Sequence, residues 1–497
     1  MSPSRLLLAL PLLLCSGAPS SAQDPKQELY AARYTSAADL YVKRLNEAPG
    51  DSEAYYGLVR ALLKAHRAQE AFAAADKAAR LTPQTAATQT ACGLAAFRRG
   101  DIAQAQADFR EALKIDPNYP GALAGLASVF STISKFKTAR TLLIRASAQA
   151  PDDPDFLPAY NNSTGGAERI ARMQRLLDAL DPASDLARSL TARIATDRAL
   201  GDRPLRKLTS PYEPARIKLI RIQDGPRHAL RGFGVRVQLN GKYTVTLLLD
   251  TGASGIVISP RAAEKAVLTR LGDAASEAKG IGDGKSQDSF SYLASEVRAG
   301  DVAFADYPVS AFRSAKDDDS DGLIGADVFR QFIVALDFPN SEIGLEPRAE
   351  GLQAGSDPVD AADTPAPGFH RVFRFGDHLV VPAMLNDKAG LLLLDTGSST
   401  NLVDTAAAKA AARVHGDSAT VVRGIQGKVD KVSRADSVSL VFAGFRQDNP
   451  ELLAIDMTKT SDGLGVGLSG IVGMPVLAQL KMTVDYREGT VRLDYNR

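Results

Sequence analysis

The sequence predicts a multidomain chain in which an all-α solenoid of helical repeats precedes two related all-β domains. Three observations support this prediction. Proline recurs every 34 residues in the N-terminal part, the motif Asp-Thr-Gly occurs twice in the C-terminal part, and each copy of the motif follows an apolar run of strand length. At 497 residues the chain is too long for one hydrophobic core, so several domains are expected.

The predicted domains differ in composition and in hydrophobic periodicity. Their boundaries fall where a helical pattern, an alternating pattern or a Gly- and Pro-rich stretch begins. The predicted parts are a signal peptide (1–22), helical repeats (26–153), a helical cap and bridge (154–214), a first β domain (215–350), a linker (351–368) and a second β domain (369–497).

The overall composition argues against several classes of partner. Lys and Arg number 59 against 58 Asp and Glu, so nothing in the charge balance indicates binding to nucleic acid or to an anionic membrane. No segment after the N-terminus approaches the roughly 18 uninterrupted apolar residues of a membrane helix, so no stable membrane insertion is expected. The five His residues show no ligand spacing, and neither a metal nor another cofactor is expected.

The N-terminus has the pattern of a secretory signal. Arg5 precedes an apolar core from Leu6 to Leu14, and small residues lead to a cleavage position after Ala22. We therefore expect a periplasmic or secreted protein after cleavage. Removal of the signal leaves Cys92 as the only thiol, so no intrachain disulfide is expected.

The region that follows has a strict 34-residue period, which is the length of a helix-turn-helix repeat. Small residues at this interval let two helices approach each other. Proline at the same interval ends the second helix of each unit because it has no N–H to donate. The recurring positions are Pro49, Pro83, Pro117 and Pro151, together with Ala37, Ala71, Ala105 and Ala139.

The residues within one unit extend this pattern. Gly93, Ala105, Phe109, Ala112 and Pro117 fall where a tetratricopeptide repeat places its small, aromatic and terminating residues. The region therefore resembles a tetratricopeptide array of three full units preceded by a truncated one. The resemblance implies a groove for a peptide or a protein partner, whereas the alternative is a packed spacer that orients the rest of the chain. The sequence leaves both open, because no cluster of one charge sign is visible on the concave positions.

Two further segments connect the repeats to the β domains. Residues 167–180 and 185–200 have helical spacing and are expected to cap the solenoid, which would otherwise end in an exposed apolar face. After Ile217 the pattern alternates as in strands, and Asn240-Gly241 gives a strong hairpin signal.

Each Asp-Thr-Gly motif is preceded by leucines that predict a buried strand. The first copy is the run 247–249 followed by Asp250, and the second is the run 391–394 followed by Asp395. The glycine of the motif lets the backbone turn where a side chain would clash. Each strand is therefore expected to deliver a carboxylate into a tight turn.

Both copies close with the same elements. A Gly-rich hairpin follows the motif, and an apolar-apolar-Gly turn then ends at Gly325, 75 residues after Asp250, and at Gly473, 78 residues after Asp395. This agreement indicates an internal duplication. The hairpin glycines are Gly280, Gly282 and Gly284 in the first copy, and Gly424 and Gly427 in the second.

The ordered set of motif, hairpin and closing turn resembles the retropepsin-like aspartic peptidases, and with the repeats it is similar to an exported bacterial group of that family. The resemblance covers residues 215–497 and implies two retropepsin-like (acid protease) domains in a pseudo-twofold arrangement. It implies an aspartic endopeptidase acting on a polypeptide substrate. Asp250 and Asp395 would share one proton and activate a water, with no metal and no covalent intermediate.

The resemblance also assigns supporting roles around the two carboxylates. The threonines would interlock across the pseudo-twofold axis, the motif glycines would permit close approach, the closing glycines would pack beneath the turns, and the hairpins would act as flaps. These residues are Thr251 and Thr396, Gly252 and Gly397, Gly325 and Gly473, and the five hairpin glycines. Ser398 stands where the first copy has Ala253, so we expect its hydroxyl to donate to Asp395 and to favour the negative charge there.

Two alternatives remain open at the level of sequence. The fold could hold peptides without cutting them, as a non-catalytic binding or scaffold protein. The two carboxylates could also pair with their own copies in a homodimer. A short tether raises the effective concentration of one motif near the other, which favours pairing within one chain and hence a monomer.

Overall fold

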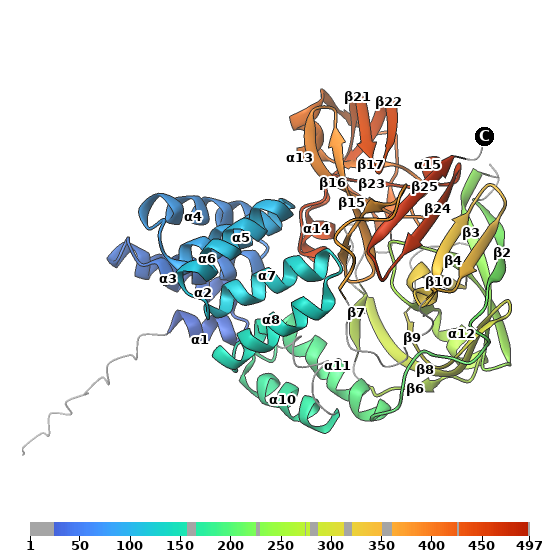
Figure 1. Cartoon of the computed structure of the whole chain (residues 1–497), viewed down its shortest axis with the longest axis horizontal. Helices are drawn as coiled ribbons and strands as arrows, with labels where there is room; N and C mark the ends of the chain where they lie inside the picture. The colour runs from blue at the N-terminus through green and yellow to red at the C-terminus, as the bar shows by residue number, and fades with distance from the viewer. Residues whose placement is uncertain are drawn as a thin grey trace, which may run out of the picture.

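The computed structural model describes residues 24–156, 166–224, 229–273, 275–278, 287–312, 321–349, 360–424 and 427–495. Helices form one end of the molecule and two β lobes form the other (Figure 1). The predicted order of an all-α solenoid and two all-β domains is confirmed. None of the helices in these ranges combines the length and apolarity needed to cross a membrane. The predicted signal peptide (1–22), the flap glycines Gly280, Gly282 and Gly284, and linker residues 351–359 lie outside the described residues.

The repeat region consists of antiparallel helix pairs with the period seen in the sequence. Helices α2, α4, α6 and α8 end two residues before the four periodic prolines, and α1 is the short helix of a truncated first unit. The helices are α1 (Pro25–Tyr30), α2 (Tyr34–Glu47), α3 (Ser52–Lys64), α4 (Ala68–Leu81), α5 (Ala86–Arg99), α6 (Ile102–Ile115), α7 (Pro120–Thr132) and α8 (Phe136–Gln149).

The small residues of the repeat allow its helices to pack closely around an aromatic ring. Phe109 of α6 is completely buried and lies between Gly93 of α5 and Gly125 of α7. A Cβ atom added to Gly93 would lie 2.6 Å from the Phe109 ring, and one added to Gly125 would also overlap that ring. The periodic alanines are buried in the same way, so the sequence period sets the distance between helices.

Two helices connect the repeats to the first β lobe. Helices α10 (Gly166–Ala179) and α11 (Asp185–Leu200) form a buried cluster with Ala32 at the start of the repeats. The other end of α11 contributes Leu200 to a small cluster with Leu271 and Leu293 of the first lobe. A short 3-10 helix, η1 (Pro154–Phe156), precedes these two helices. The helical part therefore contacts the first lobe as well as the second.

The first lobe is built from the strands that follow α11. The strands are β1 (Lys207–Leu208), β2 (Ala215–Asp224), β3 (Ala229–Leu239), β4 (Tyr243–Leu249), β5 (Ile256–Ile258), β6 (Thr269–Arg270), β7 (Ser276–Ala278), β8 (Gln287–Ala299), β9 (Val302–Ala311), β10 (Gly322–Ile324), β11 (Ile333–Asp337) and β12 (Glu342–Glu346). The lobe also contains α12 (Pro260–Lys265) and the 3-10 helix η3 (Ala326–Phe329).

The second lobe repeats this plan. Its strands are β13 (His370–Arg371), β14 (Phe373–Phe375), β15 (His378–Leu385), β16 (Lys388–Leu394), β17 (Leu402–Asp404), β18 (Val414–Asp417), β19 (Arg423–Gly424), β20 (Gly427–Lys428), β21 (Val432–Phe442), β22 (Phe445–Ile455), β23 (Gly470–Val472), β24 (Leu480–Asp485) and β25 (Thr490–Tyr495). Its helices are α13 (Thr405–Ala411), α14 (Thr458–Leu464) and α15 (Met474–Leu477).

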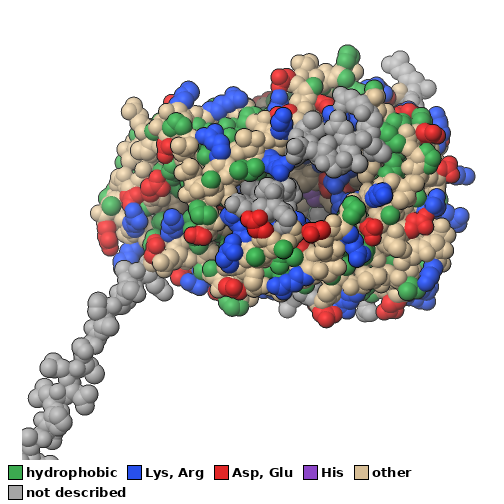
Figure 2. Space-filling view, turned by 60° about the horizontal axis from the view of Figure 1, so that its bottom comes forward, with side chains coloured by type: hydrophobic (Ala, Val, Ile, Leu, Met, Phe, Trp, Pro, Cys, Tyr) green, Lys and Arg blue, Asp and Glu red, His purple; other side chains and the backbone are tan. Residues whose placement is uncertain are grey.

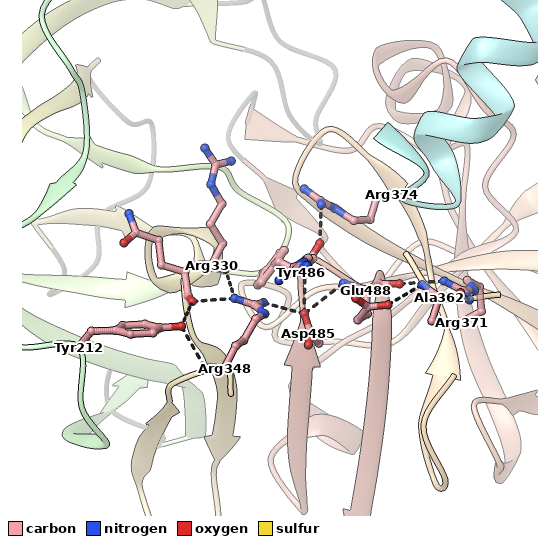
Figure 3. Close-up of polar contacts among 11 residues, drawn as sticks. Tyr212, Arg330, Arg348, Ala362, Arg371, Arg374, Asp485, Tyr486 and Glu488 are labelled. Atoms are coloured by element: carbon pink, nitrogen blue, oxygen red, sulfur yellow. Dashed lines mark hydrogen bonds and ion pairs between the residues drawn. The ribbon is translucent and has the colours of Figure 1, made fainter. Parts of the chain in front are cut away.

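The two lobes are joined by a continuous sheet. Its strands lie in the order β13-β25-β24-β11-β12-β2, so the last strands of the chain pair with the end of the first lobe. Strand β24 runs antiparallel to β11, with Val484 opposite Val334. Polar contacts reinforce the junction (Figure 3): Arg348 donates to the carbonyl of Gln331 at 2.6 Å and pairs with Asp485 at 2.6 Å. The two lobes therefore face each other within one molecule.

The repeats pack directly on the second lobe. One buried cluster contains Ile102, Phe109 and Val129 of the helices together with Leu391 and Ile471 of the lobe. Side chains from α5, α6 and α7 are thus part of the hydrophobic core that supports strands β16 and β23. The repeat region and the second lobe form one packed unit, so the repeats are more than a flexible extension.

Candidate active site

The two Asp-Thr-Gly turns meet where the lobes adjoin. Strand β4 lies parallel to β10, and the N–H of Asp250 donates to the carbonyl of Ile324 at 2.9 Å. In the second lobe β16 lies parallel to β23, and the N–H of Asp395 donates to the carbonyl of Val472 at 3.0 Å. The buried leucines of β4 and β16 hold each strand in its core. Each carboxylate therefore stands at the end of a fixed strand.

The threonines of the two motifs bind each other reciprocally. The N–H of Thr251 donates to Oγ1 of Thr396 at 3.0 Å, and the N–H of Thr396 donates to Oγ1 of Thr251 at 3.1 Å. Each hydroxyl then donates across the junction, from Thr251 to the carbonyl of Leu394 at 2.7 Å and from Thr396 to that of Leu249 at 2.8 Å. Both threonines are fully buried. These four bonds fix the turns in pseudo-twofold register.

The motif glycines bring the two carboxyl groups together. A Cβ atom added to Gly252 would lie 2.8 Å from Cγ of Asp395 and 3.1 Å from Oδ1 of Asp250. Because both distances start from the same point, Cγ of Asp395 and Oδ1 of Asp250 lie no further apart than the sum of the two distances. A Cβ atom on Gly397 would likewise overlap the carboxyl group of Asp250. Two carboxylates this close cannot both be ionised cheaply, which is the condition for sharing a proton.

Backbone donors distinguish the two carboxylates. Oδ1 of Asp250 accepts the N–H of Gly252 at 2.8 Å, whereas Oδ1 of Asp395 accepts the N–H groups of Gly397 at 2.8 Å and Ser398 at 3.1 Å. The prediction for the Ser398 hydroxyl is wrong, because that hydroxyl donates to the carbonyl of Thr400 at 2.8 Å. The donor to Asp395 is the backbone of Ser398. Donors to the charged form still favour ionisation of Asp395.

The closing glycines lie directly against the turns. A Cβ atom on Gly325 would come within 2.6 Å of the carbonyl oxygen of Ala253, and one on Gly473 within 2.6 Å of the carbonyl oxygen of Ser398. Real Cβ atoms do not approach carbonyl oxygens so closely. Only glycine at these two positions lets the closing turns support the loops that carry the carboxylates.

Substituting a motif glycine is expected to damage the site without unfolding the lobe. In Gly397→Ala the new methyl group would overlap the Asp250 carboxyl group, so one carboxylate must move. For a site that hydrolyses peptides, a displacement of this kind is expected to lower kcat/KM by about a hundredfold. Gly416→Ala is the matched control, because nothing lies within 4 Å of its added Cβ atom. Equal kcat/KM for the two variants would contradict the close approach of the turns.

The structure also reveals a buried acid that the sequence analysis missed. Asp327 in η3 is 2% exposed, and its Oδ1 accepts the N–H of Gly255 at 2.8 Å. Among the described residues its Oδ2 has no hydrogen-bond partner. Burial, and next the charge of Asp377, raise the pKa of Asp327 to about 6. The second copy has Pro475 at the corresponding place, and this difference between copies was the available signal.

Replacing this acid is expected to change how stability depends on pH. The pKa of Asp327 is raised to about 6 from 3.8, so its protonated form favours folding below pH 3.8, and this contribution is lost as the pH rises through 6. Asn is neutral and keeps the acceptor for Gly255. Asp327→Asn should therefore be more stable than wild type above pH 6, by on the order of 1–3 kcal/mol, and similar to it near pH 4. Denaturant unfolding across this range measures the difference, with the exposed Asp301→Asn as control. If the unfolding free energies of wild type and Asp327→Asn changed with pH in the same way, this would contradict the raised pKa of Asp327.

The second predicted flap is present as a hairpin. Strands β19 and β20 pair with Gly424 opposite Gly427, and the N–H of Val429 donates to the carbonyl of Val422 at 2.9 Å. Val422 and Val429 are buried in the core that the second lobe shares with the repeats. The base of the hairpin is thus anchored. The closure of the hairpin over substrate stays a prediction.

Comparison with protein families gives matches to both parts of the chain. The model of a family described as Aspartyl protease matches twice, at residues 235–328 and 381–476. A model described as Tetratricopeptide repeat matches residues 96–160. The two protease matches contain Asp250 and Asp395, and each spans its own closing glycine.

Curated relatives match only parts of the chain. Cellulose synthase operon protein C of Pseudomonas fluorescens (strain SBW25) is 30% identical over 185 residues, which is 33% of this chain and 14% of that protein. The Hsp70-Hsp90 organizing protein of Triticum aestivum is 34% identical over 97 residues, which is 20% of this chain and 17% of that protein. The chain therefore spans less than a fifth of the length of either relative.

Solved structures show similarities of low overall score. An aspartic proteinase from Irpex lacteus matches with a TM-score of 0.38 and 13% identity, over 57% of this chain and 97% of that one. The Cut9-Hcn1 hetero-tetramer of the APC/C matches with a TM-score of 0.29 and 16% identity, over 35% of this chain and 34% of that one.

Proposed function

We propose that this chain, which contains two domains of the aspartyl protease family behind tetratricopeptide repeats, is an aspartic endopeptidase. The observation that carries the proposal is the reciprocal bonding of Thr251 and Thr396, which sets Asp250 and Asp395 against each other. A pair of facing carboxylates on fixed strands is suited to hydrolysis of a peptide bond by an activated water. The substrate is accordingly a polypeptide.

The proposed mechanism divides two tasks between the carboxylates. The ionised member accepts a proton from a water held between them, and the water oxygen attacks the peptide carbonyl carbon. The protonated member donates to the carbonyl oxygen as the tetrahedral intermediate forms. The two N–H donors to Asp395 support its role as the ionised base and leave the proton on Asp250. Neither task requires a metal or a covalent intermediate.

We further propose that the repeats orient the second lobe and hold a protein substrate or partner. The shared buried core supports the orienting role. Within the repeat region, the chain itself already pairs Arg60 with Asp153 and Asp155, each at 2.7 Å. An acidic partner would have to displace these groups. Beside them remains a cavity of about 420 Å³ whose lining includes Tyr30 and Tyr119, and this cavity is the site we assign to a partner side chain.

The location and assembly state are also part of the proposal. The pattern of residues 1–22 supports export, to the periplasm or the medium, after cleavage of a signal peptide. A monomer is the proposed active form, because Asp250 and Asp395 face each other within one molecule. A homodimer would have to separate these turns before it could pair each carboxylate with its copy.

Cleavage of a peptide library tests the proposed function directly. The purified mature chain is incubated with the library between roughly pH 3 and pH 7, the range around a carboxylate pair, and products are identified by mass spectrometry. Products that are absent with Asp250→Asn are the expected result. If wild type cuts no peptide but retains peptides by binding, the competing function as a non-catalytic peptide-binding or scaffold protein is correct.

A further inference from the structure

His378 occupies a place opposite the second carboxylate. It is the first residue of β15, and the register of β15 with β16 puts Val380 opposite Leu393. Continuing this antiparallel register by two residues puts His378 opposite Asp395. The space-filling view in Figure 2 shows a hollow in one face of the molecule, with Lys, Arg, Asp and Glu side chains near its rim.

The first lobe has a glycine at the equivalent position. The register of β3 with β4 puts Gly234 opposite Leu248, and two residues further on Gly232 falls opposite Asp250. A Cβ atom on Gly232 would lie 2.7 Å from Cδ1 of Leu248 in its own lobe and 3.6 Å from the carbonyl oxygen of Thr396 in the other lobe. By pseudo-twofold symmetry, the side chain of His378 reaches the Asp-Thr-Gly turn of the first lobe. The site thus carries an imidazole on one side and no side chain on the other.

The contacts of the imidazole agree with this symmetry argument. The backbone of Gly252 and the charge of Asp250 both act on the His378 ring, so the Asp250 turn lies close to it. Nδ1 of His378 is buried and has no hydrogen-bond partner among the described residues. The neutral tautomer with its proton on Nε2 fits this environment.

Charged groups surround the imidazole on several elements. Asp250 lies in the turn after β4, and Asp377 precedes His378 in its own hairpin. Asp377 is in turn paired with Arg330 of the first lobe at 3.2 Å and with Arg374 of β14 at 3.0 Å. Asp395 directly follows β16 and lies opposite His378 when the register is continued. Burial lowers the pKa of His378 from 6.5, and it outweighs the opposing effects of the two acids and of the Gly252 backbone.

We propose that neutral His378 is a positioning residue that holds the Asp250 turn from the opposite lobe, and that its protonation in acid disables the carboxylate pair. Protonation would put an N–H on Nδ1, where the described residues offer no acceptor. It would also put a positive charge beside Asp250 and favour loss of the proton that Asp250 must donate. This inference rests on the proposed peptidase function. It predicts that protonation of His378 determines the pH below which kcat/KM falls.

The pH dependence of kcat/KM tests this role. His378→Gln keeps a donor for Gly252 and cannot be protonated in this range. Its activity should persist to lower pH than that of wild type, with the acid limb displaced by about one pH unit and relative activity there about tenfold higher. His415→Gln, an exposed histidine of the same lobe, is the control and should keep the wild-type limb. Coincident acid limbs for wild type and His378→Gln would overturn the proposal. If the Gln variant does not fold, His378→Asn takes its place.

A second measurement does not depend on activity. In the full-length chain with isotopically labelled histidine, NMR follows the titration of His378, identified by the signal missing in His378→Gln. Asp250→Asn removes an attractive charge and should lower the pKa of His378. An unchanged titration would overturn the contact between His378 and the Asp250 turn. If the titration shifts as expected but wild type cuts no peptide, the proposed peptidase function is the part that fails.

Discussion

Replacing Asp250 or Asp395 by Asn is expected to abolish peptide cleavage. Each carboxylate supplies one half of the proton transfer, so either substitution should lower kcat/KM by about 10²–10⁴-fold or more. Asn keeps an oxygen that can accept the N–H groups of Gly252 or Gly397, and both turns should therefore stay folded. Steady-state kinetics and thermal unfolding measure the two properties separately.

The control for this pair is an acid away from the site. Asp301 is exposed at the turn between β8 and β9, so Asp301→Asn should leave both cleavage and unfolding temperature unchanged. Substantial cleavage by either Asp250→Asn or Asp395→Asn would contradict the shared mechanism. Loss of cleavage together with loss of folding would show that the substitution acted through stability.

The second large effect is expected at the contact between the repeats and the second lobe. Arg98 at the end of α5 forms an ion pair with Asp462 of α14, and both side chains are about nine-tenths buried. The adjoining backbone is also joined, because the N–H of Gly467 donates to the carbonyl of Arg98 at 2.8 Å. Asp462→Ala leaves a buried cation without this partner, which typically costs about 3–5 kcal/mol of unfolding free energy.

The next arginine of α5, which pairs with an acid of α4, provides the matched control. Arg99 and Asp76 are 3.6 Å apart, with 43% and 56% of their side chains exposed. Asp76→Ala should therefore change the unfolding free energy by less than about 1 kcal/mol. The double variant Arg98→Met with Asp462→Leu should recover much of the stability lost in Asp462→Ala, since no charge is left buried. Equal effects of Asp462→Ala and Asp76→Ala in denaturant unfolding would contradict a packed interface.

Much of the architecture follows from local patterns in the sequence. The proline period predicts the ends of α2, α4, α6 and α8 because a proline two residues beyond a helix marks its end wherever the chain goes next. The leucines before each Asp-Thr-Gly motif likewise predict a buried strand from local sequence alone, and the glycine of the motif predicts the turn that follows. Asp250 and Asp395 lie at the ends of β4 and β16, as this local pattern indicates.

Long-range features could not be predicted in this way. The pairing of β24 with β11 joins residues about 150 positions apart, and nothing in either strand specifies the other. The same holds for the core that Phe109 and Leu391 share, because either side chain could pack against many different apolar surfaces. Such contacts depend on the folded shapes of whole domains, which a pattern along the chain does not contain.

The hydrogen-bond partners of side chains within the site could not be predicted from the sequence either. The sequence shows that Ser398 has a hydroxyl where the first copy has none, yet several acceptors lie within reach of such a group. The hydroxyl bonds to the carbonyl of Thr400, and the backbone N–H bonds to Asp395 instead. Likewise His378 shows no motif spacing, because its contact with the Asp250 turn is made between lobes.

The central claim is that Asp250 and Asp395 of one molecule share a single site. The most direct test is to mix purified Asp250→Asn and Asp395→Asn chains over a range of concentrations that allows exchange between subunits, and to measure peptide cleavage. If the pair forms within one chain, the site of every chain in the mixture contains one Asn and one Asp. No activity should then appear at any concentration. Activity that appears on mixing and rises with concentration would show that the intact Asp250 of one chain pairs with the intact Asp395 of another, and would contradict the account, whereas pairing of each carboxylate with its own copy would leave activity in the separate variants.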